Sequence, residues 1–487
     1  MIGVVIIHGF FPNKTGHQLA NNSRRTSVSM RIYLPEISWH DREPIYSCSF
    51  NPADPSKFAT CGVGRQIRLW RINSVLVDTQ PTVDFLSEMS WHSRTVNVVR
   101  FSNTDGLILA SGGDDAVICL SKLAPTNTIS NRKEEYSEIW QLHKTLRGHL
   151  EDVLDLVWGA DNLLLFSSSV DNAVIIWDVE KGVKQSIVNE NLGFVQSVAI
   201  DPFYCYLCTL TADQTMRVYN FNTLKKIFKV YKLSGSYLLD AAPKMNITSM
   251  KLFMGKEYGT FLRKLMFTID GQFLIATGAQ MLDSKGTFHT MAAVVFHRDN
   301  LNRPIAFLST NQESTIGVAV YPYKLVKRVQ IKSEHDNGGF ASKFNLKYRL
   351  IVAVLTEQSI LLYDSEQERP FGRICDIHYA SLTDIAWSSD GRYLSVTSID
   401  GYVTFVMINL DEFGEIYKED EMIAEDKILD TNKDPKQFEF TKFGKHAVLG
   451  HQALRSQQTS YQNLQTEEDI SLSLSHQMEE SMEISNR

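Results

Sequence analysis

A short apolar strand pattern recurs seven times along this chain of 487 residues, and this recurrence constrains the fold more than any other feature. The seven copies are QIRLW ending at Trp70, AVICL at Leu120, AVIIW at Trp177, TMRVY at Tyr219, AAVVF at Phe296, SILLY at Tyr363 and GYVTF at Phe405. The nearest copies lie 42 residues apart, within the period of about 40–45 residues that is typical of four-stranded repeat units. The sequence therefore predicts an all-β fold of seven such units, some of them enlarged by insertions.

The stretch RGHLEDVLDLVWGADNLLLFSSSVDNAVIIWDVEKG, residues 147–182, shows how one unit is built. Two turns separate three short runs of strand-forming residues, which is the pattern of repeated hairpins. The stretch also holds a histidine, serines and an aspartate, as the active site of a hydrolase does. A histidine also precedes the strands of two other units, at His40 and His92. Because the histidine recurs with the repeat, we interpret these polar residues as scaffold and not as a catalytic triad.

The chain resembles the WD40 family, with Trp177-Asp178 as the dipeptide that names the repeat and Gly148-His149 as its other hallmark. The resemblance implies a closed seven-bladed β-propeller. It also implies a structural tetrad of His149, a serine, Asp171 and Trp177, in which the serine is Ser167 or Ser169, with Ser169 preferred. The aspartate would accept hydrogen bonds from the histidine ring and from its own turn. Asp114 and Asp213 are the corresponding turn acids of two other blades.

The ends of the chain differ in character from the repeats. We expect residues 1–30 to be an N-terminal extension, disordered or preceding the native start, with Met30 as an alternative initiator. Residues 31–410 form the predicted propeller, in which the segment RIYLPEISWH, 31–40, completes the last blade and removes exposed sheet edges. Residues 411–487 contain 17 acidic and 8 basic residues, and we expect this acidic tail to be largely disordered.

Several longer motifs resemble one particular WD40 family, the middle subunit of chromatin assembly factor 1, a replication-coupled histone chaperone. These motifs are EISWHDREPIYSCSFNP (36–52), GTFLRKLMFTIDGQFLIATGAQ (259–280), NLNRPIAFL (300–308), the stretch from SILLY to GYVTF (359–405) and DEFG (411–414). They are more specific than the WD40 signature because they are long and follow one another in the family's order. The resemblance spans the propeller and stops near Tyr417.

This resemblance implies a non-catalytic subunit of a nuclear complex that deposits newly made core histones on DNA during replication-coupled nucleosome assembly. The implied partners are the large subunit of chromatin assembly factor 1 and the core histones of the central nucleosome tetramer. The family's tail carries an arginine-rich strand that docks the anti-silencing histone chaperone. Here the tail has only Arg455 and Arg487, so that docking is in doubt.

Two other binding functions remain as alternatives. A substrate adaptor of a cullin-type ubiquitin ligase would carry an arginine two residues after the WD dipeptide, where this chain has Glu180. The histone-deposition propeller of the replication-independent pathway is usually part of a much longer chain. The sequence leaves open which face of the propeller binds which partner.

Candidate partner contacts are Arg263, Lys264, Arg369 and Phe371. Arg263 and Lys264 stand beside Phe261 and Phe267, so they could form a basic and aromatic surface. The alternative is that the apolar residues of this strand face the core while the charges are solvated. We also expect contacts from exposed insertions, such as those at 121–136 and 221–258.

Composition argues against several other functions. The net charge is −7, of which the tail contributes −9, so the remainder carries +2 and little direct DNA binding is expected. No metal site or cofactor is predicted, because Cys205 and Cys208 lie in a strand where residues three apart face opposite sides. No segment reaches the length of about 20 apolar residues that spans a membrane.

Overall fold

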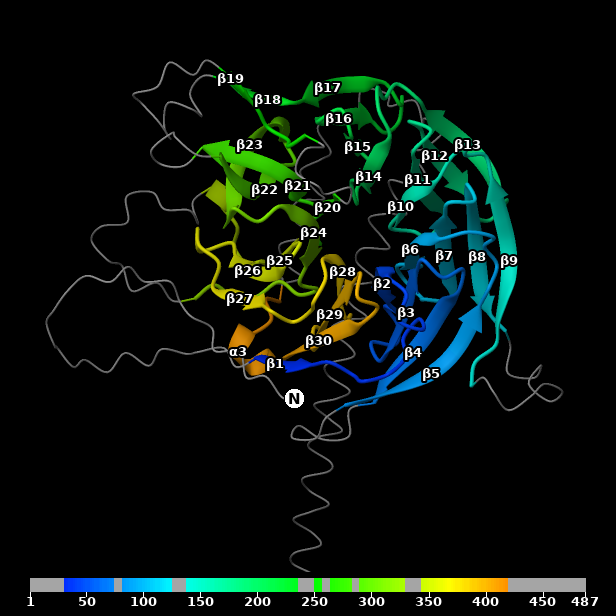
Figure 1. Ribbon diagram of the computed structural model, residues 1–487. Coiled ribbons are helices and arrows are strands. Elements are labelled where there is room, and N and C mark those ends of the chain that lie inside the picture. The colour runs from blue at the N-terminus through cyan, green and yellow to red at the C-terminus, as the bar shows by residue number, and fades with distance from the viewer. Residues whose placement is uncertain are drawn as a thin grey trace, which may run out of the picture.

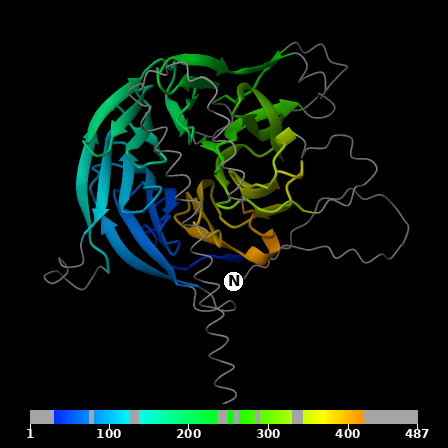
Figure 2. The same ribbon diagram turned by 180° about the vertical axis from the view of Figure 1, so that it is seen from behind.

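The computed structural model describes residues 30–73, 81–124, 137–234, 249–255, 263–282, 289–328 and 343–418. These residues form seven four-stranded antiparallel sheets arranged as blades around a central channel (Figure 1), and the same closed ring is seen from behind in Figure 2. The predicted seven-bladed propeller is therefore confirmed. None of the described helices has the length and apolar character needed to cross a membrane.

In each blade the strands run from the channel to the outer rim. Blade 1 contains β2 (Ile45–Phe50), β3 (Lys57–Gly62), β4 (Ile67–Asn73) and β5 (Thr82–Met89). Blade 2 contains β6 (Val96–Phe101), β7 (Ile108–Gly113), β8 (Val117–Leu123) and β9 (Trp140–Arg147). Blade 3 contains β10 (Val153–Trp158), β11 (Leu164–Ser169), β12 (Val174–Asp178) and β13 (Val183–Val188). Blade 4 contains β14 (Val195–Ile200), β15 (Tyr206–Thr211), β16 (Thr215–Asn220) and β17 (Lys226–Val230).

The later blades follow the same order. Blade 5 contains β20 (Leu265–Phe267), β21 (Phe273–Leu282), β22 (His289–His297) and β23 (Asn300–Asn311). Blade 6 contains β24 (Thr315–Val320), β25 (Ile351–Thr356), β26 (Ser359–Asp364) and β27 (Gly372–Cys375). Blade 7 contains β28 (Leu382–Trp387), β29 (Tyr393–Ser398), β30 (Val403–Ile408) and β1 (Met30–Tyr33). A separate two-stranded sheet pairs β18 (Lys232–Ser234) with β19 (Ser249–Lys251).

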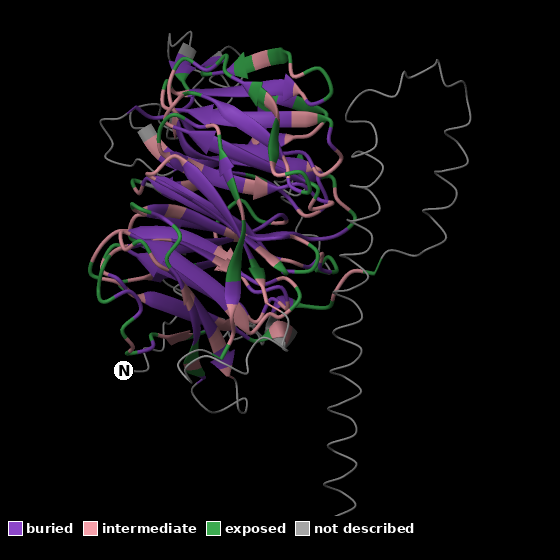
Figure 3. Ribbon diagram, turned by 90° about the vertical axis from the view of Figure 1, so that its right-hand side faces the viewer, coloured by how far each residue is buried: buried purple, intermediate pink, exposed green. Residues whose placement is uncertain are grey.

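The seven recurring apolar patterns form the third strands of the seven blades. Inner strands are sandwiched between neighbouring blades, so both of their faces are covered. All six residues of β11 are buried, whereas in β13, the outer strand of the same blade, only Val188 is buried. Figure 3 shows this gradient as buried strands inside and exposed loops and outer strands at the rim. Burial on both faces explains why these strands read as continuous apolar runs.

The N-terminal strand closes the ring, as the sequence predicted. β1 pairs antiparallel with β30, with Met30 opposite Ile408 (Figure 1). Met30 is buried, so the propeller begins at Met30 and not at Arg31. Residues 1–29 lie outside the described residues.

The C-terminal boundary also moves, because residues 411–418 pack on the propeller. The short helix α3 (Leu410–Phe413) buries Phe413 against Tyr321 and Phe371. The carbonyl of Phe413 accepts a hydrogen bond from Arg349. Gly414 follows at φ 108°, and a Cβ there would lie 2.8 Å from Arg349 Nη2, which explains the glycine of the DEFG motif. Residues 411–418, which were predicted to belong to the tail, are therefore packed on the propeller, and residues 419–487 lie outside the described residues.

The expected insertion at 221–258 is not simply a loop. It contains β17, the outer strand of blade 4, and the β18–β19 pair, whose Leu233 and Met250 are buried in the core between blades 4 and 5. Most of the other expected insertion, residues 125–136, lies outside the described residues.

Candidate functional site

The polar residues of blade 3 form one continuous hydrogen-bonded chain. His149 Nδ1 lies 2.8 Å from Asp171 Oδ2, and His149 Nε2 lies 2.7 Å from Ser167 Oγ. The indole Nε1 of Trp177 donates to the same Ser167 Oγ at 2.8 Å. Asp171 also accepts from the backbone N–H of Leu150 and of Ala173. The structure thus brings His149, Asp171 and Trp177 together through one serine.

That serine is Ser167, and the preference for Ser169 was wrong. The two serines face the same side of β11, but they lie two residues apart, which displaces their side chains by about 7 Å along the strand. Ser169 Oγ instead donates to the carbonyl of Glu151 and accepts from the N–H of Asp171. Ser169 therefore shapes the turn, while Ser167 connects the histidine to the tryptophan.

This geometry does not make Ser167 a nucleophile. Its side chain is fully buried, and its oxygen already contacts both the imidazole and the indole. Burial works to raise the pKa of Asp171, but the hydrogen bond and charge of His149 lower it below its usual value. The network can orient the turn between β11 and β12, and it has no open position for a substrate.

Blade 2 repeats the arrangement with a different aspartate from the one predicted. His92 contacts Asp115 at 3.0 Å and Ser111 at 2.8 Å. Asp114 instead accepts from Asn97 Nδ2 at 2.7 Å. The prediction was displaced by one residue because strand register makes Ser121, and not Leu120, the counterpart of Trp177. Asp115 stands six residues before Ser121.

Blades 1 and 7 contain two networks that the sequence analysis did not identify. In blade 1, Thr60 Oγ1 lies 2.8 Å from both His40 Nε2 and Trp70 Nε1, and Gly64 stands where other blades have an acid. Burial, with the charge of Arg68, lowers the pKa of His40 to about 3.

In blade 7, His378 contacts Asp400 at 3.0 Å. The spacing of 22 residues between that histidine and aspartate equals the spacing in blade 3 and could have revealed the pair.

Blade 4 replaces the histidine altogether. Asn191 Oδ1 accepts from Thr209 and from the hydroxyl of Tyr219, at 3.2 Å each. Asp213, the predicted turn acid of this blade, pairs with the buried Arg217. The turn is thus fixed by an arginine and not by an imidazole.

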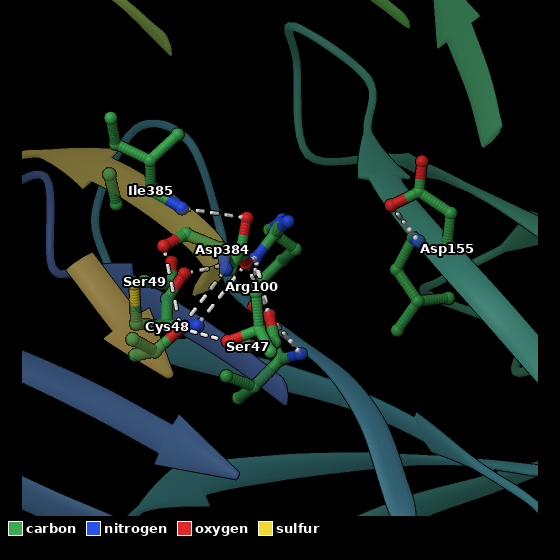
Figure 4. A network of polar contacts seen from close by, with 12 residues as sticks. Ser47, Cys48, Ser49, Arg100, Asp155, Asp384 and Ile385 are labelled. Carbon is green, nitrogen blue, oxygen red and sulfur yellow. Dashed lines mark hydrogen bonds and ion pairs between the residues drawn. The ribbon is translucent and has the colours of Figure 1, made fainter. Parts of the chain in front are cut away.

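A second polar system lines the channel and joins blade 7 to blade 1 (Figure 4). Asp384 Oδ2 accepts from Ser47 Oγ at 2.7 Å, from the N–H of Cys48 at 3.2 Å and from Arg100 Nη1 at 3.0 Å. Arg100 also donates to Ser47 Oγ and to the carbonyl of Cys48. Burial alone would raise the pKa of Asp384, but the charges of Arg100 and Lys264 and the Ser47 hydrogen bond lower it.

The matching position of blade 3 carries the same chemistry. Asp155 Oδ2 accepts from Ser197 Oγ of blade 4 at 2.6 Å, and Lys264 Nζ lies 2.7 Å from Asp155 Oδ1. The sequence offered a signal for both carboxylates, since β10 reads VLDLVW and β28 reads LTDIAW. Together the two acids and two cations line a cavity of about 430 Å³, and their formal charges cancel.

The four candidate partner contacts fall in different environments. Arg263 is buried, donates to the carbonyl of Gly255 and packs against Gly278, so it is no surface residue. Lys264 faces the channel and pairs with Asp155. Arg369 is exposed, while Phe371 packs against Phe413. The structure does not bring these four residues together as one surface.

The cysteines give no sign of redox or metal chemistry within the described ranges. Cys208 is buried in β15, whereas Cys205 is exposed and lies in the turn before that strand, so the two cysteines do not share a strand, contrary to the prediction. Burial raises the pKa of the channel-lining Cys48 to about 12, so its thiol stays protonated. No cluster of three His, Cys, Asp or Glu side chains suited to a metal occurs among the described residues.

Comparisons with known proteins agree with the fold and with the longer motifs. Residues 30–413 match the family described as the CAF1B/HIR1 beta-propeller domain. A mouse protein named as a subunit of chromatin assembly factor 1 is 40% identical over 406 residues, which cover 81% of this chain and 70% of that protein. The rice protein named chromatin assembly factor 1 subunit FAS2 homolog is 34% identical over 397 residues, covering 80% of this chain and 75% of that protein.

A third relative belongs to the other branch of the family. The Kluyveromyces lactis protein named HIR1 is 27% identical over 396 residues, which cover 79% of this chain but only 43% of that protein. Identity and coverage are therefore both higher for the mouse and rice proteins, which are named after chromatin assembly factor 1. With the match over residues 30–413, these similarities show that the chain belongs to the CAF1B/HIR1 beta-propeller family.

Proposed function

We propose that this protein is a non-catalytic subunit of a nuclear histone chaperone complex that deposits newly made core histones during replication-coupled nucleosome assembly. The observation that carries the proposal is the 40% identity to a mouse protein named as a chromatin assembly factor subunit over 70% of that protein's length. A scaffold role fits the polar networks described above, because their histidine and serine atoms are occupied within the blades. The propeller would hold the large subunit, and together the two subunits would deliver core histones.

Charge supports recruitment through proteins and not through DNA. Residues 1–410 carry a net charge of +2, and the two cations in the channel are each paired with an aspartate. Sequence-independent DNA binding needs many phosphate contacts, and its affinity grows with the number of phosphates neutralised. The proposed subunit would therefore reach chromatin as part of a complex.

The proposal can be tested by purifying the tagged full-length chain from replicating cells and identifying its partners by mass spectrometry. We expect the large subunit of chromatin assembly factor 1 and core histones of the central tetramer. Recovery of a cullin with its adaptor would favour the ubiquitin-ligase alternative. Recovery of replication-independent deposition factors without the large subunit would favour a HIR1-like role.

A further inference from the structure

The three most exposed large apolar side chains of the described residues occupy one structural position. Leu150, Leu192 and Tyr379 have relative exposures of 84%, 81% and 106%, and the next such residue, Val183, has 51%. Leu150 and Tyr379 directly follow His149 and His378, and Leu192 follows Asn191, which replaces the histidine in blade 4. All three therefore project from the end of the propeller that carries the histidine–aspartate pairs, which we call the histidine end.

The fold holds two of these side chains outward in a fixed way. The N–H of Leu150 donates to Asp171 and the N–H of Tyr379 donates to Asp400, so the histidine–aspartate network fixes the backbone beneath each side chain. Because the backbone is already ordered, binding a partner there costs little further conformational entropy. An exposed leucine adds nothing to the propeller core, and its side chain is free to contact a partner.

Leu150 and Leu192 flank the same turn in neighbouring blades. Leu150 contacts Asp171 through its N–H, and Asn191, next to Leu192, donates to the carbonyl of Asn172 at 3.1 Å. The two leucines therefore lie on either side of the turn formed by Asp171 and Asn172. We refer to Leu150 and Leu192, at the histidine end of blades 3 and 4, as the leucine pair.

The surroundings of this pair are acidic. The histidine-end loops of blades 2–4, residues 90–95, 113–116, 147–152, 170–173, 189–194 and 212–214, contain seven acidic and two basic residues. Two of these acids, Asp213 and Glu190, already pair with Arg217 and Lys226 of neighbouring strands. Glu151 and Asp152 directly follow Leu150. Burial and the neighbouring charges of Asp114 and Glu151 raise the pKa of Asp152, as expected where carboxylates repel one another. A cation brought to this place would relieve that repulsion.

We propose that Leu150 and Leu192, with Glu151 and Asp152, form a docking surface for a lysine- and arginine-rich segment that carries an apolar side chain, supplied by the core histones. Apolar anchors surrounded by charges of one sign favour a partner with apolar residues and the opposite charge. The chain's own acidic tail has the wrong charge to occupy this surface. The inference rests on the proposed function and adds the face and the chemistry by which histones are bound.

The test titrates the purified core-histone tetramer of the central nucleosome into the full-length chain and measures affinity by fluorescence anisotropy. The double variant Leu150→Ser with Leu192→Ser should keep the wild-type melting temperature, because both side chains are exposed, and should bind at least about tenfold more weakly. Glu151→Gln with Asp152→Asn should weaken binding at low salt and have a smaller effect at high salt. Leu107→Ser, at an exposed leucine in the turn between β6 and β7 at the opposite end, is the matched control and should bind normally.

The inference would be overturned if the leucine double variant bound the tetramer with wild-type affinity. It would also be overturned if the Leu107→Ser control lost as much affinity as the double variant. Absence of tetramer binding by the wild-type chain would also overturn it. If the double variant lost the large subunit but kept the histones, the surface would serve the other partner and the inference would be wrong. Failure of the wild-type chain to bind the large subunit would count against the proposed function instead, so the two failures are distinguishable.

Discussion

Two seams of the propeller use nearly the same contacts in different topological settings. At the seam between blades 3 and 4, Asp155 accepts from Ser197 and pairs with Lys264. At the seam between blades 7 and 1, Asp384 accepts from Ser47 and pairs with Arg100.

The settings differ in how the chain continues. Blades 3 and 4 are consecutive in the chain. The three inner strands of blade 7 are instead joined to blade 1 by non-covalent contacts, namely the pairing of β30 with β1 and side-chain contacts such as Ser47 with Asp384. The same aspartate contacts can therefore contribute differently to the stability of the whole ring at the two seams. Where the chain itself does not connect two blades, side-chain contacts and one short strand must close the ring.

Removing the closing strand should have the largest effect. A chain that lacks residues 30–37 loses the β1–β30 pairing and exposes the edge of blade 7, so we expect its melting temperature to fall by many degrees. A chain that begins at Met30 is the matched control and should melt like the full chain. If calorimetry gave both truncated chains the same melting temperature, the role of β1 in closing the ring would be contradicted.

Replacing the two channel aspartates, one at a time, should show how much each seam contributes to the free energy of unfolding. Asp384→Ala leaves Arg100 without its carboxylate in the channel, which should cost about 3–5 kcal/mol of unfolding free energy. Asp155→Ala removes the same type of contact but leaves consecutive blades joined by the chain, so its cost should be smaller. Urea unfolding measures both. A larger loss for Asp155→Ala would show that local contacts, and not ring closure, decide the difference.

The serine donors offer a finer version of the same test. Ser47→Ala and Ser197→Ala each remove one hydroxyl that donates to a buried carboxylate, at 2.7 Å and 2.6 Å, and each should cost about 1–3 kcal/mol. Because neither change removes a charge, we expect the ring to stay closed and the two losses to be similar. Unfolding curves with unequal slopes would instead indicate that the ring opens in one variant.

A further prediction concerns pH and blade 1. The pKa of His40 falls from 6.5 to about 3 on folding, so the unfolded chain binds an additional proton between these values. The contribution of neutral His40 is therefore complete above pH 6.5 and is lost progressively as the pH falls toward 3. His40→Asn, which copies Asn191 of blade 4, should be less stable at neutral pH but less sensitive to pH. If the stabilities of variant and wild type differed by the same amount at neutral pH and at about pH 4, this prediction would be wrong.

The sequence predicted the parts of the fold that local pattern controls. The third strand of every blade follows from the recurring spacing. The meeting of His149, Asp171 and Trp177 and the closing role of the N-terminal strand were implied by the resemblance to WD40 propellers. The serine of blade 3 and the aspartate of blade 2 were displaced, because register between strands decides which side chains meet and a pattern of apolar residues does not fix register to one position.

The channel and the histidine end were harder to foresee. Arg100 and Asp384 lie 284 residues apart, and only closure of the ring brings them together. Leu150 and Leu192 resemble ordinary apolar residues in the sequence, and their exposure becomes visible only when the loops are placed. The conflict between their apolar character and their exposure is the feature that points to binding.

The most direct test of the proposed role is reconstitution of histone deposition from purified components. The full-length chain, the large subunit of chromatin assembly factor 1 and core histones are combined with DNA, and nucleosome formation is measured by nuclease protection with and without this chain. We predict that the chain forms a stable complex with the large subunit, that deposition requires it, and that the chain alone loses DNA at physiological salt. No association with the large subunit, or tight salt-resistant DNA binding by the chain alone, would contradict the proposed role.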